Sequence, residues 1–253
     1  MNIAIAQIKP FKGAISANIE KHIKCIEIAV SLNSNAIFFP ELSLTGYEPE
    51  LAKDLATHQN DNRLDQLQEI STLKNITIGV GVPTKTENGI QISMIVFRPD
   101  QERLSYSKQQ LHEDELPYFE KGNKQLIIEV ENQKIIPAIC YESLQTQHAE
   151  KASKLGGEIY LASVAKSQNG VEKGFKHYPE VAEKYAIPVL MANCIGECDN
   201  FVSVGFSSVW TKEGKLAGQL DNKNEGIIVF NTVTEEITKQ MIPTQSNMFE
   251  HQR

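Results

Sequence analysis

The sequence predicts an α/β fold in which mixed β-sheets are covered by helices. Strand-like and helix-like segments alternate along the chain, and the long helix-like segments carry one apolar stripe each, as helices that cover a sheet do. Strand-like segments joined by short turns also occur, so we expect antiparallel pairs beside parallel ones. No repeat, low-complexity tract or Pro/Gly/Ser-rich linker interrupts the 253 residues, which favours a single domain over residues 1–253.

The first segments alternate between strand and helix. Residues 2–8 are expected to form a buried strand, and residues 14–32 an amphipathic helix whose apolar side chains recur at helical spacing. Residues 36–39 form a short apolar strand that ends at Pro40, and residues 63–74 form a second amphipathic helix. Segments in this order build the β-α-β part of a mixed sheet.

A β-meander is predicted next. Its strands are residues 76–82, 90–97 and 103–106, and the first of them is rich in β-branched side chains. Asn88-Gly89 and Pro99-Asp100 mark the turns between the strands.

The second half of the chain returns to the alternation of strands and helices. A hairpin turn is expected at residues 131–133, and Gly156-Gly157 is expected to end a helix. The predicted strands are residues 125–130, 134–139, 158–162, 188–194, 201–211 and 226–231, and the predicted helices are residues 143–155 and 172–185.

The composition argues against several classes of protein. The chain has a net charge of −7 and no broad basic stripe, which argues against binding to nucleic acid through its phosphates. Its start lacks the basic segment of a secretory signal, and no apolar run approaches the ~18–20 residues of a membrane helix. We therefore expect a cytoplasmic protein that does not enter a membrane.

The cysteines are too sparse for a disulfide framework in a chain of this length, so free thiols are expected. Cys194 and Cys198 lie close in sequence, but a structural zinc site needs four ligands, and no second cysteine pair or histidine-rich segment lies nearby. No metal site is predicted.

Three polar residues stand where predicted strands end. Glu41 follows the strand at residues 36–39, Lys108 follows the strand at residues 103–106, and Cys140 follows the strand at residues 134–139. Catalytic groups of α/β folds lie at such junctions. Taken singly, each residue has an ordinary explanation as a buried thiol, a helix cap or a solvated lysine, and the spacing alone does not show that they meet.

Together these residues could perform acyl transfer. A nearby cation such as Lys108 and the start of a helix near Ser143 would favour the thiolate of Cys140. Glu41 could accept the thiol proton and later pass it to a leaving amine. The Tyr141 N–H and the Lys108 ammonium could stabilise the oxyanion, and each such donor contributes roughly 3–4 kcal/mol in acyl transfer.

The sequence around these residues resembles the nitrilase superfamily of carbon–nitrogen hydrolases. The similar blocks are residues 38–47 (FFPELSLTGY), residues 106–111 (YSKQQL) leading to residues 118–122 (YFEKG), and residues 136–142 (IPAICYE). They occur in the family's order, and weaker similarity extends from Asn2 to about Phe230.

The resemblance implies a four-layer α-β-β-α sandwich and a set of roles. Glu41 would be the general base, Lys108 the oxyanion and orientation group, and Cys140 the nucleophile that forms a thioester. A second glutamate is implied near the site; Glu115 is the best match, with Glu113 and Asp114 as rivals. No metal or organic cofactor is implied, and the expected assembly is a homodimer or a larger homo-oligomer.

Substrate-binding residues are predicted less directly. Tyr47 and Tyr118 could line the pocket or simply pack in the core. Residues 163–166, which include Ser163 and Ala165, lie where related enzymes shape their substrate preference. Tyr141 and Glu142, which directly follow Cys140, are also predicted to contact the substrate.

Further residues bear on the choice of reaction. The resemblance suggests that Glu142 favours an amidase over a nitrilase. Phe206 stands where the family has a second glycine, and it could reshape the packing beside the pocket. His112 is assigned to the pocket edge or to structure rather than to catalysis, because the resemblance gives the base role to Glu41.

The sequence therefore predicts a hydrolase that cleaves the C–N bond of a small linear amide through a cysteine thioester and releases ammonia or an amine. Alternatives with the same residues are a nitrilase and an N-carbamoyl amide hydrolase. An alternative of another class is a catalytically silent member that binds a small molecule or a protein. A glutaminase or acyl-transfer module is a further alternative, which the lack of a second, synthetase-like domain in the sequence disfavours.

Overall fold

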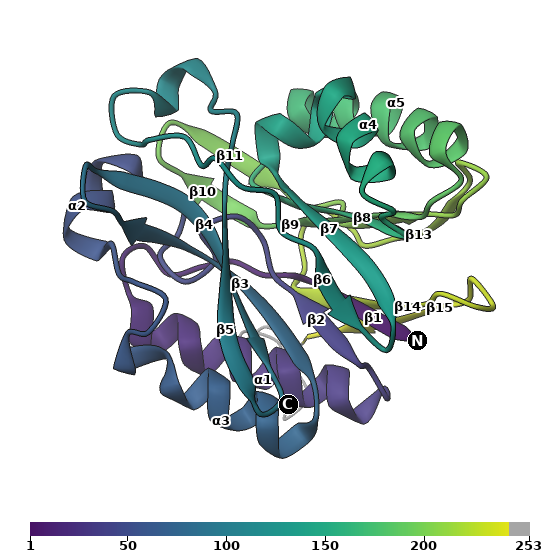
Figure 1. Ribbon diagram of the computed structural model, residues 1–253, viewed down its shortest axis with the longest axis horizontal. Coiled ribbons are helices and arrows are strands. Elements are labelled where there is room, and N and C mark those ends of the chain that lie inside the picture. The colour runs from purple at the N-terminus through teal and green to yellow at the C-terminus, as the bar shows by residue number, and fades with distance from the viewer. Residues whose placement is uncertain (243–253) are drawn as a thin grey trace, which may run out of the picture.

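In the computed structural model, residues 1–242 are described, and they form two mixed β-sheets packed face to face between two layers of helices (Figure 1). This is the predicted four-layer α-β-β-α sandwich. Residues 243–253 belong to the predicted domain but lie outside the described residues. No helix within the described part of the chain is long and apolar enough to cross a membrane.

The first sheet has the strand order β15-β14-β1-β2-β3-β4-β5, with β1, β2 and β3 parallel and the other neighbours antiparallel. Helices α1 (Ile15–Ser31) and α3 (Asp65–Lys74) cover its outer face. The strands are β1 (Asn2–Gln7), β2 (Ala36–Phe38), β3 (Thr77–Lys85), β4 (Ile90–Arg98), β5 (Gln101–Ser107), β14 (Gly226–Asn231) and β15 (Ile237–Met241).

The second sheet has the order β13-β12-β9-β8-β7-β6, with β7, β8 and β9 parallel. Helices α4 (Thr146–Lys154) and α5 (Gln168–Tyr185) cover its outer face. The strands are β6 (Ile128–Val130), β7 (Gln133–Ile139), β8 (Ile159–Val164), β9 (Val189–Asn193), β12 (Ser208–Trp210) and β13 (Leu216–Gln219).

The remaining elements are short. Strands β10 (Ile195–Cys198) and β11 (Phe201–Val204) form a separate antiparallel ribbon. The remaining helices are α2 (Ala52–Leu55) and the 3-10 turns η1 (Pro49–Leu51), η2 (Asn62–Leu64), η3 (Glu113–Glu115) and η4 (Cys140–Leu144).

The central core lies between the sheets. Ile5 and Phe38 from the first sheet pack with Ile139 and Leu161 from the second, and all four are buried. Burial of apolar area at roughly 25 cal/mol per Å² is the main force that holds the two sheets together. Because β2 and β7 both face this core, the polar residues that follow them can approach one another.

Some segments differ from the prediction. The predicted helix at residues 143–155 is split into η4 and α4, because Gln145 adopts extended backbone between them. The predicted strand at residues 201–211 is broken into β11 and β12 at Gly205 and Phe206, which both have positive φ. Strands β10, β13 and β15 are short and irregular in pattern, and they were not predicted.

Candidate active site

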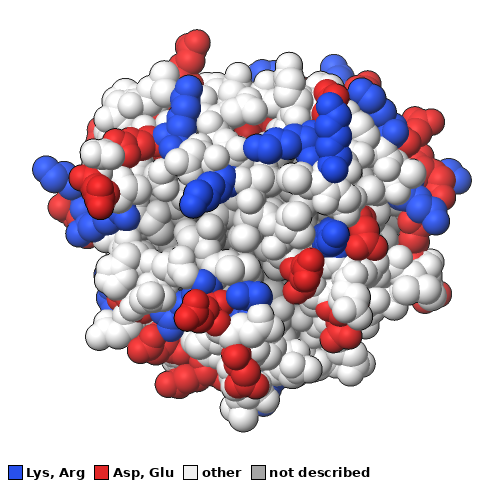
Figure 2. Space-filling model, viewed as in Figure 1, with Lys and Arg blue, Asp and Glu red and all other residues white. Residues whose placement is uncertain are grey.

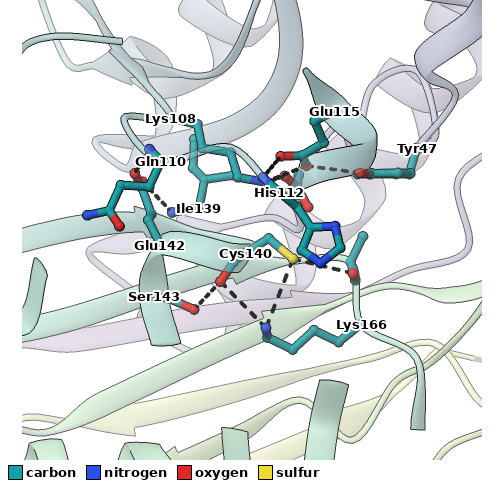
Figure 3. Close-up of polar contacts among 12 residues, drawn as sticks. Tyr47, Lys108, Gln110, His112, Glu115, Ile139, Cys140, Glu142, Ser143 and Lys166 are labelled. Carbon is teal, nitrogen blue, oxygen red and sulfur yellow. Dashed lines mark hydrogen bonds and ion pairs between the residues drawn. The ribbon is translucent and has the colours of Figure 1, made fainter. Parts of the chain in front are cut away.

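The chemically active side chains come from the ends of strands in both sheets. In the first sheet, Glu41 follows β2 and Lys108 directly follows β5. In the second sheet, Cys140 directly follows β7, and Lys166 follows β8. Figure 3 shows the side chains of Lys108 and Lys166 on either side of the sulfur of Cys140.

Lys108 is fully buried between two carboxylates. Its Nζ lies 2.8 Å from Oε1 of Glu41 and 2.5 Å from Oε1 of Glu115. The Tyr47 hydroxyl donates to the same oxygen of Glu115 at 2.9 Å, and the backbone N–H of His112 donates to its other oxygen at 2.8 Å. The carboxylate beside Lys108 is therefore Glu115 and not its exposed neighbour Glu113.

These contacts determine the ionisation of Lys108 and Glu41. Burial favours the neutral form of Lys108, but Glu41 and Glu115 outweigh this effect and raise its pKa above the ordinary value, so the ammonium persists. Burial raises the pKa of Glu41 to about 7, and the charge of Lys108 opposes that rise. Oε2 of Glu41 has no conventional hydrogen bond within the described residues, which leaves it available to a proton donor.

Cys140 sits at a strained turn directly after its strand. Its φ is +48°, in the left-handed region that non-glycine residues rarely adopt. Burial, followed by the charge of Glu41, raises the pKa of the thiol to about 12, although Lys166 and Lys108 act in the opposite direction. The resting form is thus the thiol. Lys108 therefore acts in the direction expected from the sequence and favours the thiolate, but the desolvation of the buried sulfur outweighs it, and the helix α4 begins only at Thr146.

Glu142 holds the turn at Cys140 against the loop that follows Lys108. The Tyr106 hydroxyl donates to its Oε1 at 2.6 Å, and the N–H of Ile139 donates to the same oxygen at 2.8 Å. The N–H groups of Gln109 and Gln110 donate to Oε2 at 2.7 and 3.2 Å. This carboxylate links the residues beside Cys140 to those beside Lys108.

A cavity of about 580 Å³ opens onto these groups. Its volume is within the range of small-molecule sites. Of the predicted residues, it is lined by Tyr47, Lys108, Glu115, Cys140, Tyr141 and Ala165. Glu41 lies behind this wall, bonded to Lys108. The ring of His112 is also in the wall, where it stacks edge-on against Tyr141 and pairs with Asp114.

Three predicted substrate-binding side chains do not line this cavity. Tyr118 is 40% exposed and lines a separate surface hollow with Leu116. Glu142 is fully buried, and its oxygens are occupied as described above. The Ser163 hydroxyl donates to the carbonyl of Phe39 at 2.8 Å and so ties the two sheets together. Their positions support structural roles.

The sequence does not single out Lys166, which contacts Cys140, or Asn193, which binds the backbone of Lys166. Lys166 was included only in a segment expected to shape preference, yet its Nζ lies 4.0 Å from the Cys140 sulfur. Asn193 accepts from the Lys166 N–H at 2.9 Å through its side-chain oxygen and donates to the Lys166 carbonyl at 3.3 Å. Asn193 is the last residue of the parallel strand β9, and Lys166 follows the parallel strand β8. A position at the carboxyl end of a parallel strand is the one signal in the sequence that could have identified them.

Cys194, Cys198 and Phe206 lie outside the wall of this cavity. Cys194 and Cys198 are buried with their sulfurs 3.8 Å apart, and residues 1–242 hold no group of three or more His, Cys, Asp or Glu side chains that could bind a metal. Phe206 lines a different hollow with Phe175, so its bulk does not narrow the cavity at Cys140.

Solved structures of an amidase share this fold. The amidase NitN of Nesterenkonia sp. AN1 matches with a TM-score of 0.84 and 21% identity over 91% of this chain and 92% of its own. A mutant of that amidase carrying acrylamide on its active-site cysteine matches with a TM-score of 0.85 and 20% identity over 93% of this chain and 94% of its own.

Sequence comparison adds relatives with different names. The chain is 30% identical to the glutamine-dependent NAD(+) synthetase of Aquifex aeolicus over 94% of this chain, and 28% identical to that of Acinetobacter baylyi over 88%. It spans 42% of the length of each. It is also 25% identical to a probable nitrilase of Schizosaccharomyces pombe over 98% of this chain and 94% of that protein.

The family model described as carbon-nitrogen hydrolase matches residues 2–241, which is nearly the whole described part of the chain. The two-sheet fold and the ordered sequence blocks agree with that match. The chain therefore belongs to the carbon–nitrogen hydrolase family of the nitrilase superfamily.

Proposed function

We propose that the protein hydrolyses a small linear amide through a thioester on Cys140. The observation that carries the proposal is the buried Glu41–Lys108–Glu115 cluster, which lies beside a cysteine thiol at a cavity of small-molecule size. A thiol of raised pKa reacts only when a base takes its proton, and Glu41 is a carboxylate with one uncommitted oxygen beside it.

The first half of the reaction acylates the enzyme. Glu41 accepts the Cys140 proton while the sulfur attacks the amide carbon, so that a C–S bond forms and the carbonyl becomes an oxyanion. The Lys108 ammonium and the Tyr141 N–H, at the start of a helical turn where N–H groups lack partners within the helix, face that charge. Glu41 then gives the proton to the nitrogen, the C–N bond breaks, and ammonia or an amine leaves.

The second half regenerates the thiol. Glu41 takes a proton from a water molecule, whose oxygen attacks the thioester carbon. The tetrahedral intermediate collapses with cleavage of the C–S bond, and the proton returns from Glu41 to the sulfur. A carboxylic acid is released. Glu115 keeps Lys108 charged and in place through both halves, with Tyr47 and the His112 N–H fixing that carboxylate.

Replacement of the nucleophile tests the proposal. Cys140→Ala should lower ammonia release from small amides such as butyramide by at least about a thousandfold, because the acyl-enzyme cannot form. Cys25→Ala, which removes a buried thiol far from the cavity lining, is the matched control and should keep most of the activity. Equal turnover by Cys140→Ala and the unmodified protein would disprove the mechanism.

Glutamine is a second candidate substrate. The similarity to glutamine-dependent NAD(+) synthetases favours it, since the chain matches a part of those proteins that is about its own length. In that case, glutamate would form together with ammonia. A direct comparison of glutamine with simple amides and with the corresponding nitriles distinguishes glutaminase, amidase and nitrilase activity, and N-carbamoyl compounds belong in the same panel.

We also propose that the protein is a homodimer in the cytoplasm, acting on a small molecule rather than on a nucleic acid or a membrane. Closed symmetric association is the usual state of such chains, and the outer helical layers offer the surfaces for it. Sedimentation at several concentrations should give twice the mass of the chain. A monomer at all concentrations would contradict the proposed dimer.

A further inference from the structure

The end of the cavity away from Glu115 contains an unusual cation. Lys166 is only 5% exposed, and its Nζ lies 4.0 Å from the Cys140 sulfur and 3.5 Å from the Cys140 carbonyl oxygen. Figure 3 shows the ammonium groups of Lys108 and Lys166 on opposite sides of that sulfur. Lys108 has two carboxylate partners, whereas Lys166 forms no ion pair with any side chain of residues 1–242.

This cation is both fixed and charged. Asn193 binds the N–H and the carbonyl of Lys166, so the start of the side chain cannot drift. Burial lowers the pKa of Lys166, but the negative charges of Cys140, Tyr178 and Glu41 in their ionised forms outweigh burial and raise the pKa above its ordinary value. A buried ammonium without a counter-charge costs several kcal/mol, so a bound anion would stabilise the site.

The surroundings of Lys166 also favour an anion. Helix α5 begins at the cavity and has no acidic residue in its first turn. Lys173 on that helix lines the cavity, and Nε2 of His177 is buried with no hydrogen-bond partner in the described structure. On the face drawn in Figure 2, lysine and arginine side chains are spread over the upper layer that contains α4 and α5, although the whole chain is acidic.

The acidic groups of the cavity wall are engaged elsewhere. Glu115 is bonded to Lys108, and Asp114 is paired with His112. No other acidic residue lines this cavity within the described chain. The end at Lys166 therefore attracts a carboxylate, while the two acidic side chains of the wall already have partners, Lys108 for Glu115 and His112 for Asp114.

We propose that the acyl half of the substrate carries a carboxylate that pairs with Lys166, so that the substrate is the monoamide of a short dicarboxylic acid. This assignment rests on the proposed hydrolysis at Cys140. The amide carbon bonds to the sulfur, its oxyanion faces Lys108, and the far carboxylate lies against Lys166 on the other side. Glutamine and asparagine carry an α-ammonium group that would need a carboxylate partner in the cavity. A substrate without an amino group is therefore favoured.

The geometry also limits the length of the acyl chain. Nζ of Lys166 lies 4.0 Å from the sulfur, and a charge-assisted hydrogen bond adds about 2.8 Å, so the carboxylate oxygen is at most about 7 Å from the sulfur. An extended chain advances roughly 1.2 Å per bond, which gives about six bonds. Monoamides with one to three methylene groups, namely malonamate, succinamate and glutaramate, remain within this distance when fully extended, whereas adipamate would have to bend.

The test compares succinamate with butyramide, a neutral amide of similar size, by ammonia release. The unmodified protein should prefer succinamate. Lys166→Gln should lower the ratio of kcat/KM for succinamate to that for butyramide by roughly 10- to 100-fold, chiefly through KM, because a charged hydrogen bond is lost. Lys166→Arg should restore part of the ratio. Lys176→Gln, on the same helix but outside the cavity lining, removes the same charge and should leave the ratio unchanged.

Several results would overturn the proposal. An equal loss with both amides in Lys166→Gln would mean that Lys166 serves Cys140 and not the substrate. Faster hydrolysis of adipamate than of succinamate would contradict the proposed chain length. Faster hydrolysis of glutamine than of succinamate would contradict the proposal that the substrate has no amino group. If Lys166→Gln does not fold, competition decides: succinate should inhibit the unmodified protein at least tenfold more tightly than butyrate, and equal inhibition would refute the carboxylate site.

Calorimetry with Cys140→Ala separates the two proposals, since binding needs no turnover. Succinamate bound by Cys140→Ala but not by a Cys140→Ala/Lys166→Gln double variant would support the carboxylate site, even if no amide were hydrolysed. Hydrolysis of butyramide without any preference for succinamate would leave the amidase proposal intact and refute the assignment of Lys166.

Discussion

At the scale of single residues, the ionisation of Glu41 decides when the site can react. Burial raises the pKa of this carboxyl to about 7, so a large fraction is protonated in slightly acidic solution. Only the carboxylate form can accept the proton of Cys140, whose own pKa of about 12 keeps it a thiol.

The pH dependence of catalysis follows from this pKa. Below about pH 7, kcat/KM should fall by about tenfold per pH unit, because protonated Glu41 cannot act as the base. The rate should level off above that pH. Glu41→Gln should reduce turnover at every pH and remove this acid limb from whatever activity is left.

Circular dichroism at each pH is the control, since it separates titration of the base from unfolding. A rate that stays constant from pH 5 to 8, with the fold intact, would show that Glu41 is not the titrating base.

Some residues of the candidate site can be predicted from the sequence, and others cannot. Glu41, Lys108 and Cys140 each follow a strand and lie in distinctive sequence blocks, so pattern and resemblance together located them. Lys166 carries no such signature, because a lysine after a strand is ordinarily solvated. Only the packed structure reveals that it is buried beside the thiol.

At the scale of elements, the turn that carries Glu41 depends on the close approach of β3. Gly81 lies in β3, and a Cβ there would overlap the backbone of Pro40 and Leu42 on either side of Glu41. Its carbonyl accepts from the Leu44 N–H at 2.9 Å, and its N–H donates to the Ser43 hydroxyl at 3.1 Å. A neighbouring strand thus supports the loop that carries Glu41.

Gly81→Ala should therefore displace Glu41 from Lys108. We expect a loss of about 1–3 kcal/mol in the free energy of unfolding and a fall in kcat, because the clash is with backbone that cannot swing aside. Urea denaturation and ammonia release measure the two effects. Gly89→Ala, at the end of the same hairpin, would meet only the flexible side chain of Glu120 and should have little effect. Similar losses in both variants would contradict this role of Gly81.

The long elements were predictable for a physical reason that does not extend to the short ones. Helix α1 has enough turns to show its apolar stripe, and β3 and β4 flank a clear Asn-Gly turn. Strands β10 and β13 each have four residues, too few for a period to emerge. Helix α5 begins at Gln168, before the predicted residue 172, because its first turn is polar and lies at the cavity.

At the scale of the whole molecule, the groups of the proposed reaction come from both sheets. Glu41 and Lys108 belong to the first sheet, whereas Cys140 and Lys166 belong to the second. The four-layer architecture came from the resemblance, since alternation of strands and helices indicates an α/β fold but not the number of its sheets.

Activity and structure should consequently disappear together in urea. Trp210 is the only tryptophan and is buried under α5 on the second sheet, so its fluorescence reports on that sheet, while circular dichroism reports on both. The midpoints of ammonia release, fluorescence and circular dichroism should coincide for a cooperative domain. Activity lost while Trp210 keeps its native emission would show that the sheets separate first.

The division of the reacting groups between the sheets gives the chain a built-in test of its own assembly. A break in the connection between β5 and β6 would leave Glu41 and Lys108 in one fragment and Cys140 and Lys166 in the other. Neither fragment alone could form an acyl-enzyme with a working base. Hydrolysis after mixing would then require the two fragments to reassociate.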